Sequence, residues 1–185
     1  GKSVVLRLIR EELLRRGVSE DYIIYMNFES FEWIDMKEAK ALYAHIREAT
    51  KASGKYYILL DEIQEVTDWE KAVNAFLVDL DVDIYVTGSN SRLLSSEFST
   101  YLAGRYVAFH IMTLSFREYL LFHDLPLTIS VSDRKTEFLK YLRMGGFPAI
   151  HTANYDYNAI YKIVYDIYSS VILRDTVQRH SIRNV

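Results

Sequence analysis

Short apolar runs alternate along the first half of the chain with longer segments whose apolar residues recur at helical spacing. The runs at 22–28, 56–60 and 84–86 have the length of buried strands. Segments 3–16 and 39–49 carry apolar residues three and four positions apart, which is typical of helices packed on a core. Strands that alternate with helices predict parallel strands joined by crossovers. We therefore expect an α/β fold with helices on both faces of a parallel sheet.

Residues with strong positional preferences mark the ends of several predicted helices. Gly17 follows the first helix at the position of a left-handed C-terminal cap. Asp35 with Glu38, and Ser115 with Glu118, have the spacing of capping boxes, in which side chains satisfy orphan backbone N–H groups. Each of these pairs predicts the start of a helix.

The apolar pattern changes in the second half of the chain. Residues 106–111 have the apolar character of one further strand. Beyond residue 112 the strand signal fades, and segments 132–143 and 155–175 predict helices separated by a Gly-Gly-Phe-Pro turn at 145–148. We therefore expect a small helical region after the α/β part.

Composition narrows the class of protein. The 185 residues are 50% hydrophobic and 25% charged, as in ordinary soluble domains. A net charge of −3 argues against a strongly basic nucleic-acid binder, and the absence of cysteine excludes disulfides and thiolate metal sites. No apolar run approaches the roughly 18 residues that span a bilayer, and the first residues do not form a signal peptide. We expect a cytoplasmic protein without a membrane partner. Because the chain opens on glycine, we also expect it to begin inside a longer protein.

Gly1, Lys2 and Ser3 stand immediately before the first predicted helix. They match the last three residues of the phosphate-binding loop G-x-x-x-x-G-K-[ST]. A helix N-terminus offers unpaired N–H groups and a partial positive charge to phosphate. The lysine of such a loop reaches the β- and γ-phosphates, and the serine hydroxyl binds magnesium. Taken alone, an accidental tripeptide explains these three residues equally well.

The apolar run at 56–60 ends in two carboxylates, Asp61 and Glu62. Open parallel sheets bind ligands at the carboxyl ends of their strands. An aspartate there can support magnesium through its water shell, and a neighbouring glutamate can act as general base toward water. A solvated acidic turn would have the same residues. The order of Gly-Lys-Ser, helix, strand, helix and acidic strand end favours the nucleotide site.

Each of the other candidate site residues has two possible roles. Ser89 and Asn90 follow the third predicted strand, where they could contact a γ-phosphate or cap a helix. Asn27 ends the first strand and could hydrogen-bond Glu62, or satisfy nearby backbone groups. Arg105 could neutralise charge on a transferring phosphoryl group, from its own or a neighbouring subunit, or pair with a local carboxylate.

Together these motifs resemble those of the bacterial and archaeal AAA+ superfamily ATPases that carry a C-terminal domain of unknown function. The matching stretches span nearly the whole chain in family order: GKS, YMNFES, YYILLDEIQEVTDWEKAV, IYVTGSNSRLLSSE, LAGRY, LSFREYL, GGFP and ILRDTVQRHSIRN. DEIQ followed by TGSNSRLL and LSFREYL is more specific than any single motif. The resemblance implies a three-layer P-loop NTPase-type sheet, a following helical region, and ATP with Mg²⁺ as cofactors.

The resemblance also implies roles and boundaries. It suggests a Walker A end (Gly1, Lys2, Ser3), a Walker B pair (Asp61, Glu62), a sensor (Asn90 or Ser89), a residue that restrains the catalytic glutamate (Asn27) and an arginine after the sensor (Arg105). It divides the chain into an ATPase core at 1–112, a helical extension at 113–150 and the truncated start of a C-terminal helical domain at 151–185. The core would lack its first strand and the front of Walker A. In such folds that strand lies in the middle of the sheet.

We therefore expect magnesium-dependent ATP hydrolysis coupled to conformational change, with Glu62, Asn90 and Arg105 as catalytic residues. One alternative is a nucleotide-regulated switch or interaction module with little turnover, and another is a DNA-associated motor. The resemblance also suggests a homo-oligomer, and a protein or DNA partner that the sequence does not identify. Without the front of the phosphate loop, the chain alone is expected to bind nucleotide weakly or to be inactive.

Overall fold

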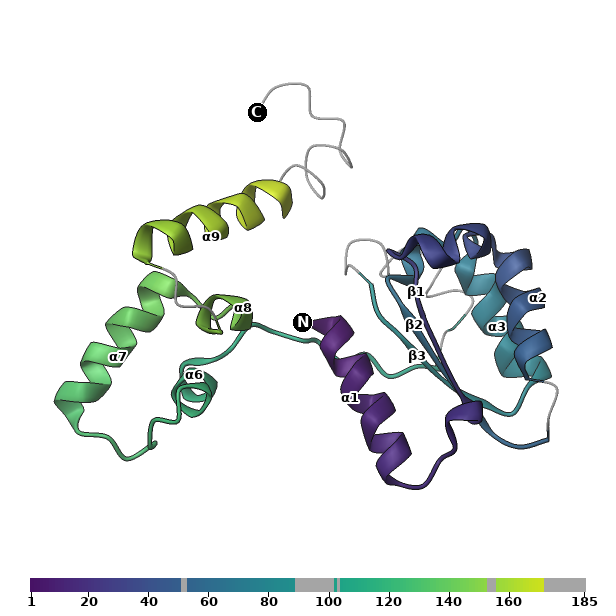
Figure 1. Cartoon of the computed structure of the whole chain (residues 1–185), viewed down its shortest axis with the longest axis horizontal. Coiled ribbons are helices and arrows are strands. Elements are labelled where there is room, and N and C mark those ends of the chain that lie inside the picture. Colours follow the sequence, from purple (N-terminus) through teal and green to yellow (C-terminus); the bar gives the residue numbers. More distant parts are fainter. Residues whose placement is uncertain (51–52, 89–101, 103, 153–155, 172–185) are drawn as a thin grey trace. The chain divides into compact units, whose positions relative to one another are not determined.

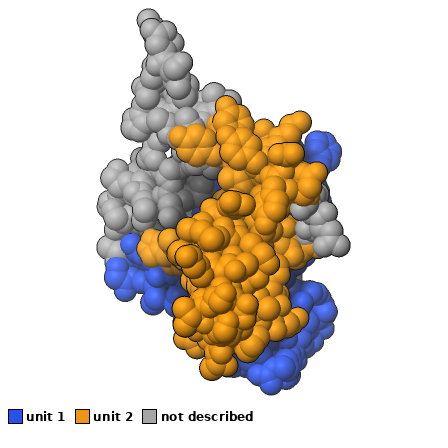
Figure 2. Space-filling model, turned by 90° about the vertical axis from the view of Figure 1, so that its left-hand side faces the viewer, with its two compact units in different colours: residues 1–109 blue, residues 110–185 orange. Residues whose placement is uncertain are grey.

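The computed structural model describes residues 1–50, 53–88, 102, 104–152 and 156–171. The chain forms two compact units, residues 1–109 (unit 1) and residues 110–185 (unit 2), which are coloured separately in Figure 2. The elements of unit 1, labelled in Figure 1 where there is room, are α1 (Lys2–Arg15), η1 (Glu20–Tyr22), β1 (Ile23–Asn27), η2 (Phe31–Met36), α2 (Ala39–Ala49), β2 (Tyr56–Asp61), η3 (Ile63–Glu65), α3 (Trp69–Asp79) and β3 (Val82–Val86). Those of unit 2 are α6 (Phe116–Phe122), α7 (Val131–Met144), α8 (Pro148–His151) and α9 (Tyr157–Val171).

Unit 1 is built around a parallel sheet with the strand order β1-β2-β3. Ile58 of the central strand pairs with Ile24 of β1 on one side and with Ile84 of β3 on the other. Helices α2 and α3 connect these strands in sequence, as parallel strands require a crossover between them. The carboxyl ends of the described strands consequently lie at one edge of the sheet.

Helices cover both faces of this sheet, because alternate strand residues point to opposite sides. On one face, Leu6 and Leu13 of α1 pack with Ile23 and Leu59. The opposite face forms the larger core with α2 and α3, and its fully buried members include Met26, Phe28, Leu42, Ile46, Ile58, Leu60 and Phe76. Figure 1 shows α1 on one side of the strands and α2 with α3 on the other. This arrangement confirms the expected α/β fold.

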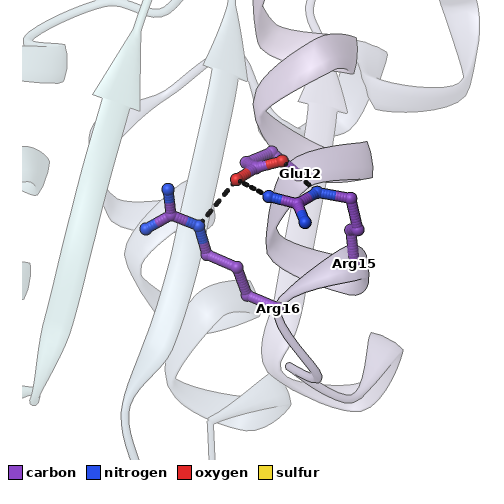
Figure 3. A network of polar contacts seen from close by, with 3 residues as sticks. All are labelled: Glu12, Arg15 and Arg16. Atoms are coloured by element: carbon purple, nitrogen blue, oxygen red, sulfur yellow. Dashed lines mark hydrogen bonds and ion pairs between the residues drawn. The ribbon is translucent and has the colours of Figure 1, made fainter.

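Helix α1 ends as the sequence predicts. Gly17 has φ = +87°, and the Val18 N–H donates to the Leu13 carbonyl at 3.1 Å, so the left-handed cap is confirmed. In the last turns, Glu12 accepts hydrogen bonds from the guanidinium groups of Arg15 at 2.6 and 2.7 Å and of Arg16 at 2.7 Å (Figure 3). The bonds from Arg15, followed by those from Arg16, lower the pKa of Glu12 to about 2.

The prediction of a capping box formed by Asp35 and Glu38 is wrong. Asp35 lies within η2, and α2 begins at Ala39 with Glu38 as its N-cap and no side-chain cap bond. Glu38 forms a parallel bridge with Thr67, and its φ of −122° and ψ of 136° are those of an extended strand. This backbone pairing prevents the helix from starting earlier, so the tertiary contact overrides the local pattern.

The further strand expected at 106–111 is also absent, since these residues have no regular secondary structure. Val107 is 77% exposed and Phe109 is 82% exposed. A strand is stabilised by pairing with a neighbour, and β1 and β3 are the two outer strands of the described sheet. Residues 106–111 pair with neither of them, so the apolar run forms no strand.

Unit 2 consists of helices in its described part, as the fading strand signal predicts. The capping box at the start of α6 is confirmed: Ser115 Oγ accepts the Glu118 N–H at 3.3 Å, and Glu118 Oε2 accepts the Ser115 N–H at 2.7 Å. The buried side chains include Tyr119, Leu120 and Ile150. No helix in the described parts of either unit is long and apolar enough to cross a bilayer.

Candidate functional site

The carboxyl ends of the strands bring together several of the residues that the sequence predicts for a site. Asn27 pairs with Asp61 across β1 and β2, and Thr87 follows β3 directly, with its N–H bonded to the Leu60 carbonyl at 2.9 Å. By the alternation of the strands, Asn27 and Asp61 lie on the face covered by α1. The site is therefore an edge between the sheet and the start of α1.

Asp61 is a buried carboxylate held by two hydroxyl groups. Its side chain is 0% exposed; Thr87 Oγ1 donates to Oδ1, and the Tyr25 hydroxyl donates to Oδ2 at 3.2 Å. Burial, and then the charge of Asp61, raise the pKa of Tyr25, so its phenol stays protonated and able to donate. Within the described residues, Asp61 has no ion pair with a lysine, arginine or histidine.

Glu62 continues from Asp61 in an uncommon backbone conformation. Its φ of 54° and ψ of 46° are left-handed, which costs a non-glycine residue about 1–2 kcal/mol. The Glu62 N–H donates to Thr87 Oγ1 at 3.2 Å, and the Ile63 N–H donates to the Thr87 carbonyl at 3.0 Å. The partly buried Glu62 carboxylate accepts a hydrogen bond from Gln64 Nε2. Thr87 thus fixes the backbone turn that carries Glu62 away from the end of β2.

The start of α1 reaches the same edge of the sheet. Lys2 Nζ donates to the Gly88 carbonyl at 2.6 Å, and Gly88 follows the residue that holds Asp61. Gly1 is the N-cap of α1, and its carbonyl accepts the Val4 and Val5 N–H groups at 3.1 and 3.3 Å. Ser3 lies partly buried in the first turn of α1. The lysine ammonium and the buried carboxylate are thereby linked through two consecutive residues after β3.

The other predicted site residues are placed differently. Asn27 Oδ1 accepts the Glu29 N–H at 3.0 Å, so the described bond of this side chain is local, whereas Glu62 bonds Gln64. Arg105 Nη1 donates to Asn74 Oδ1 at 3.1 Å, which places it beside α3. Ser89 and Asn90 lie outside the described residues.

Sequence reasoning gave no role to Tyr25, Thr87 or Gln64, which contact the predicted carboxylates. The stretch after the third strand does predict a polar contact near the site, but periodicity does not show which of its residues makes it. Tyr25 stands two residues before Asn27, and residues two apart in a strand share a face. This position indicates that Tyr25 lies on the same side of the sheet as the site. Finding it from sequence would require the register between β1 and β2.

The donor set of this edge fits a magnesium ion. Mg²⁺ prefers oxygen ligands and usually combines one or two carboxylates with waters and substrate phosphates. Among the described residues, the fully buried Asp61 carboxylate receives hydrogen bonds from two hydroxyls and makes no ion pair. A buried carboxylate without a cationic partner is costly when it is charged, and a metal ion would offset that cost. Asp61 is the residue here that would hold or support the metal, with the Ser3 hydroxyl at the start of α1 as a second oxygen.

Comparison with known proteins gives the family. The sequence profile described as an AAA domain matches residues 1–120. An uncharacterized protein of Haemophilus influenzae (strain Rd) is 38% identical over 185 residues, which is 100% of this chain and 45% of that protein. An uncharacterized protein of Methanocaldococcus jannaschii is 35% identical over 179 residues, covering 94% of this chain and 40% of that protein. The chain thus spans less than half the length of these relatives, and no solved structure matches it. On this match, the chain belongs to the AAA domain family of P-loop ATPases.

Proposed function

We propose that the intact protein binds ATP with Mg²⁺ at the edge between α1 and the carboxyl ends of the strands, and hydrolyses it to drive a conformational change. The observation that supports this most directly is the chain of contacts from Lys2 through Gly88 and Thr87 to Asp61. It joins a helix start that carries an ammonium group to a buried carboxylate at a strand end. These are the two halves of a triphosphate–metal site.

In this proposal each residue at the edge has one role. The Lys2 ammonium leaves the Gly88 carbonyl and binds the β- and γ-phosphates, while the backbone N–H groups of the first turn of α1 point toward the same anion. Asp61 and Ser3 hold the metal. Bound magnesium would supply neutralisation of the charge on the phosphate oxygens.

Glu62 is the proposed general base. Its left-handed backbone turns the carboxylate out of the strand, and the Gln64 amide donates to one of its oxygens. A carboxylate held in this way can accept a proton from the attacking water as it approaches the γ-phosphorus. Asn27, whose side chain bonds the Glu29 N–H here, would restrain Glu62 only after exchanging that bond.

The remaining predicted residues belong to the same proposal. Asn90, or Ser89, would sense the γ-phosphate from the segment that follows Gly88. Arg105 lies beside α3, on the other side of the sheet from α1, so it would more readily serve a phosphoryl group bound by a neighbouring copy. That role requires a homo-oligomer.

The test is ATP binding and turnover by the intact protein, with Lys2→Ala, Glu62→Gln and the control Glu65→Gln. Glu65 is a nearby, exposed acid in η3, and its carboxylate lies 4.0 Å from the Lys37 ammonium. We expect Lys2→Ala to weaken binding and Glu62→Gln to keep binding while losing about 100-fold or more of turnover. Glu65→Gln should resemble the wild type.

Two results would favour the alternative functions. If the wild-type protein binds ATP tightly and never hydrolyses it, the site belongs to a nucleotide-regulated switch or interaction module. If turnover appears only with DNA, and DNA binding weakens steeply with salt, the protein is a DNA-associated motor. A wild-type protein that ignores adenine nucleotides would refute the nucleotide site itself.

A further inference from the structure

The buried carboxylate at the end of β2 receives one hydroxyl on each of its two oxygens. Thr87 Oγ1 donates to Asp61 Oδ1 from the β3 side, and the Tyr25 hydroxyl donates to Oδ2 at 3.2 Å from the β1 side. Two donors on different oxygens, from the strands on either side, fix both the position and the rotation of the carboxylate plane. A single donor would leave the group free to turn about its Cβ–Cγ bond.

The sheet register explains why Tyr25 can reach Asp61. Tyr25 pairs with Leu59, and Asp61 is two residues further along the same face of β2. The tyrosine side chain is long enough to pass from one row of the sheet to the next, and it packs with the residues beneath α1 on the way. A serine or threonine at position 25 would be too short to make this contact.

We propose that Tyr25 is a positioning residue that orients Asp61 for Mg²⁺, so that it sets the affinity of the protein–ATP complex for the metal without contacting nucleotide or metal itself. This inference rests on the proposed function, since it needs a nucleotide–metal site at this edge. An ionised carboxylate has about four lone-pair sites, and the two hydroxyls occupy two of them. No other hydrogen bond to these two oxygens is described in residues 1–50 or 53–88, so the remaining sites could bind the metal or its bound water.

A residue that orients a metal ligand affects the affinity for the metal more than the stability of the fold. Loss of such an outer hydrogen bond typically weakens metal binding about 10–100-fold. Tyr25→Phe removes only the hydroxyl and keeps the ring that packs beneath α1. The variant therefore separates orientation of Asp61 from packing of the sheet.

The chain offers a matched control in Tyr85. Both tyrosines are partly buried on the same face, and they flank the same residue, because Leu59 pairs with Tyr25 on one side and with Tyr85 on the other. Of these two tyrosines, Tyr25 donates to Asp61, and Tyr85 has no described hydrogen bond to it. Tyr85→Phe therefore removes an equivalent hydroxyl without touching the carboxylate.

The experiment measures binding of a fluorescent ATP analogue to the intact protein, first in EDTA and then during a Mg²⁺ titration. We expect Tyr25→Phe to weaken the apparent Mg²⁺ affinity by about 10-fold and to leave the affinity in EDTA unchanged within about twofold. Tyr85→Phe should match the wild type in both conditions.

Three other outcomes of this titration would refute the positioning role of Tyr25. Coincident Mg²⁺ titrations of Tyr25→Phe and wild type would refute the positioning role while leaving the proposed function intact. Equal loss of affinity with and without Mg²⁺ would show that Tyr25 acts through the fold, and would also refute it. A wild-type protein that binds no ATP analogue would remove the proposed function, and this inference with it.

A double-mutant cycle with Thr87→Val sharpens the test. Thr87→Val keeps the β-branched shape and removes the second hydroxyl on Asp61, together with the acceptor of the Glu62 N–H. If both hydroxyls act by holding one carboxylate, the second removal costs less than the first, because the group is already free to turn. Losses of Mg²⁺ affinity that simply multiply would contradict a shared action on Asp61.

Discussion

Units 1 and 2 are stabilised in different ways. In unit 1, side chains from three strands and two helices form an apolar core in which Phe28, Phe76 and Leu60 are fully buried. In unit 2, the contacts at the centre join aromatic rings to polar partners: the Tyr119 hydroxyl donates to Glu137 Oε2 at 3.0 Å, and its ring lies 5.2 Å from that of His151. The described core of unit 1 is apolar, whereas the buried centre of unit 2 combines apolar side chains such as Leu120 and Ile150 with specific hydrogen bonds.

This difference indicates which unit can hold a site rigidly. A close-packed core has low compressibility, so the packed residues beneath the strand ends restrain Asp61 and Thr87. Unit 2 leaves large apolar side chains of its helices exposed, including Leu139 at 50% and Leu142 at 60% of α7. We expect its stability to be lower and to respond more strongly to pH.

The largest expected effect comes from truncating one aromatic residue in each unit, a buried one in unit 1 and an exposed one in unit 2. Phe76 is 0% exposed and stacks on Tyr43 with ring centroids 5.8 Å apart, so Phe76→Ala should cost about 3–5 kcal/mol of the free energy of unfolding. Phe138 is 42% exposed and meets Phe116 edge to face at 5.1 Å, so Phe138→Ala should cost only about 1 kcal/mol.

The two units can be followed separately in one denaturation experiment. The chain has two tryptophans, Trp33 and Trp69, and both lie in unit 1, so tryptophan fluorescence reports that unit. Hydrogen exchange of peptides from 110–171 reports the other. If Phe138→Ala proves as costly as Phe76→Ala, unit 2 has a core as tightly packed as that of unit 1, and the comparison fails.

A smaller effect is expected from acidification of unit 2. His151 Nε2 lies 2.9 Å from the Gly145 carbonyl, which can only accept, so this nitrogen carries a proton. In the neutral ring, Nδ1 then accepts from His123 Nε2 at 3.2 Å. Burial, and then the neighbouring His151, lower the pKa of His123, although Glu137 and Asp124 act in the opposite direction and Lys140 adds to the lowering.

The sign of the pH effect follows from that lowered pKa. Below the unfolded pKa of about 6.5, the unfolded chain binds more protons at His123 than the folded one, so stability falls as pH decreases. Hydrogen exchange in unit 2 should therefore lose protection between about pH 7.5 and about pH 5.5, and unit 1 should change less. His123→Gln should reduce this pH dependence, and the exposed His110→Gln should not. Equal pH dependence in both units would contradict the assignment to the histidine pair.

The smallest effect is expected at the exposed end of α1 (Figure 3). The pKa of Glu12 is lowered to about 2, so the stability it contributes is present above the unfolded pKa and is lost as pH falls from there through the folded pKa of about 2. Solvent screens such surface pairs, so Glu12→Gln should change the urea midpoint of unit 1 only slightly at neutral pH, and still less as the pH falls toward about 2. Glu11→Gln, at the next exposed position, is the control. A large shift would mean that this network stabilises α1 more than surface pairs usually do.

Much of unit 1 can be predicted from sequence because its signals are local and agree with each other. The apolar runs place β1 and β2 within one residue or so of their observed bounds, and Gly17 marks the end of α1 by its need for positive φ. Asp61 and Glu62 stand out because two carboxylates directly follow a buried strand. In unit 2, the Ser115–Glu118 pair identifies the start of α6 for the same reason.

The features that the sequence did not predict have a common physical cause, because they depend on contacts between segments that are distant in the chain. The bridge between Glu38 and Thr67 prevents the capping box that the Asp35–Glu38 pattern predicts. No feature of the local sequence indicates this bridge. The contact of Tyr25 with Asp61 requires the register of two strands that are separated by α2. The roles of Thr87 and Tyr25 therefore become visible only when the strands are paired.

The left-handed backbone of Glu62 has a consequence for how the protein balances folding against activity. Glycine adopts this conformation without steric cost, so the fold alone would favour glycine at position 62. A glutamate there weakens the native state and gives in return a carboxylate directed away from the strand. A search for stabilising substitutions would select glycine at this position and, under the proposed function, would remove the proton acceptor with it.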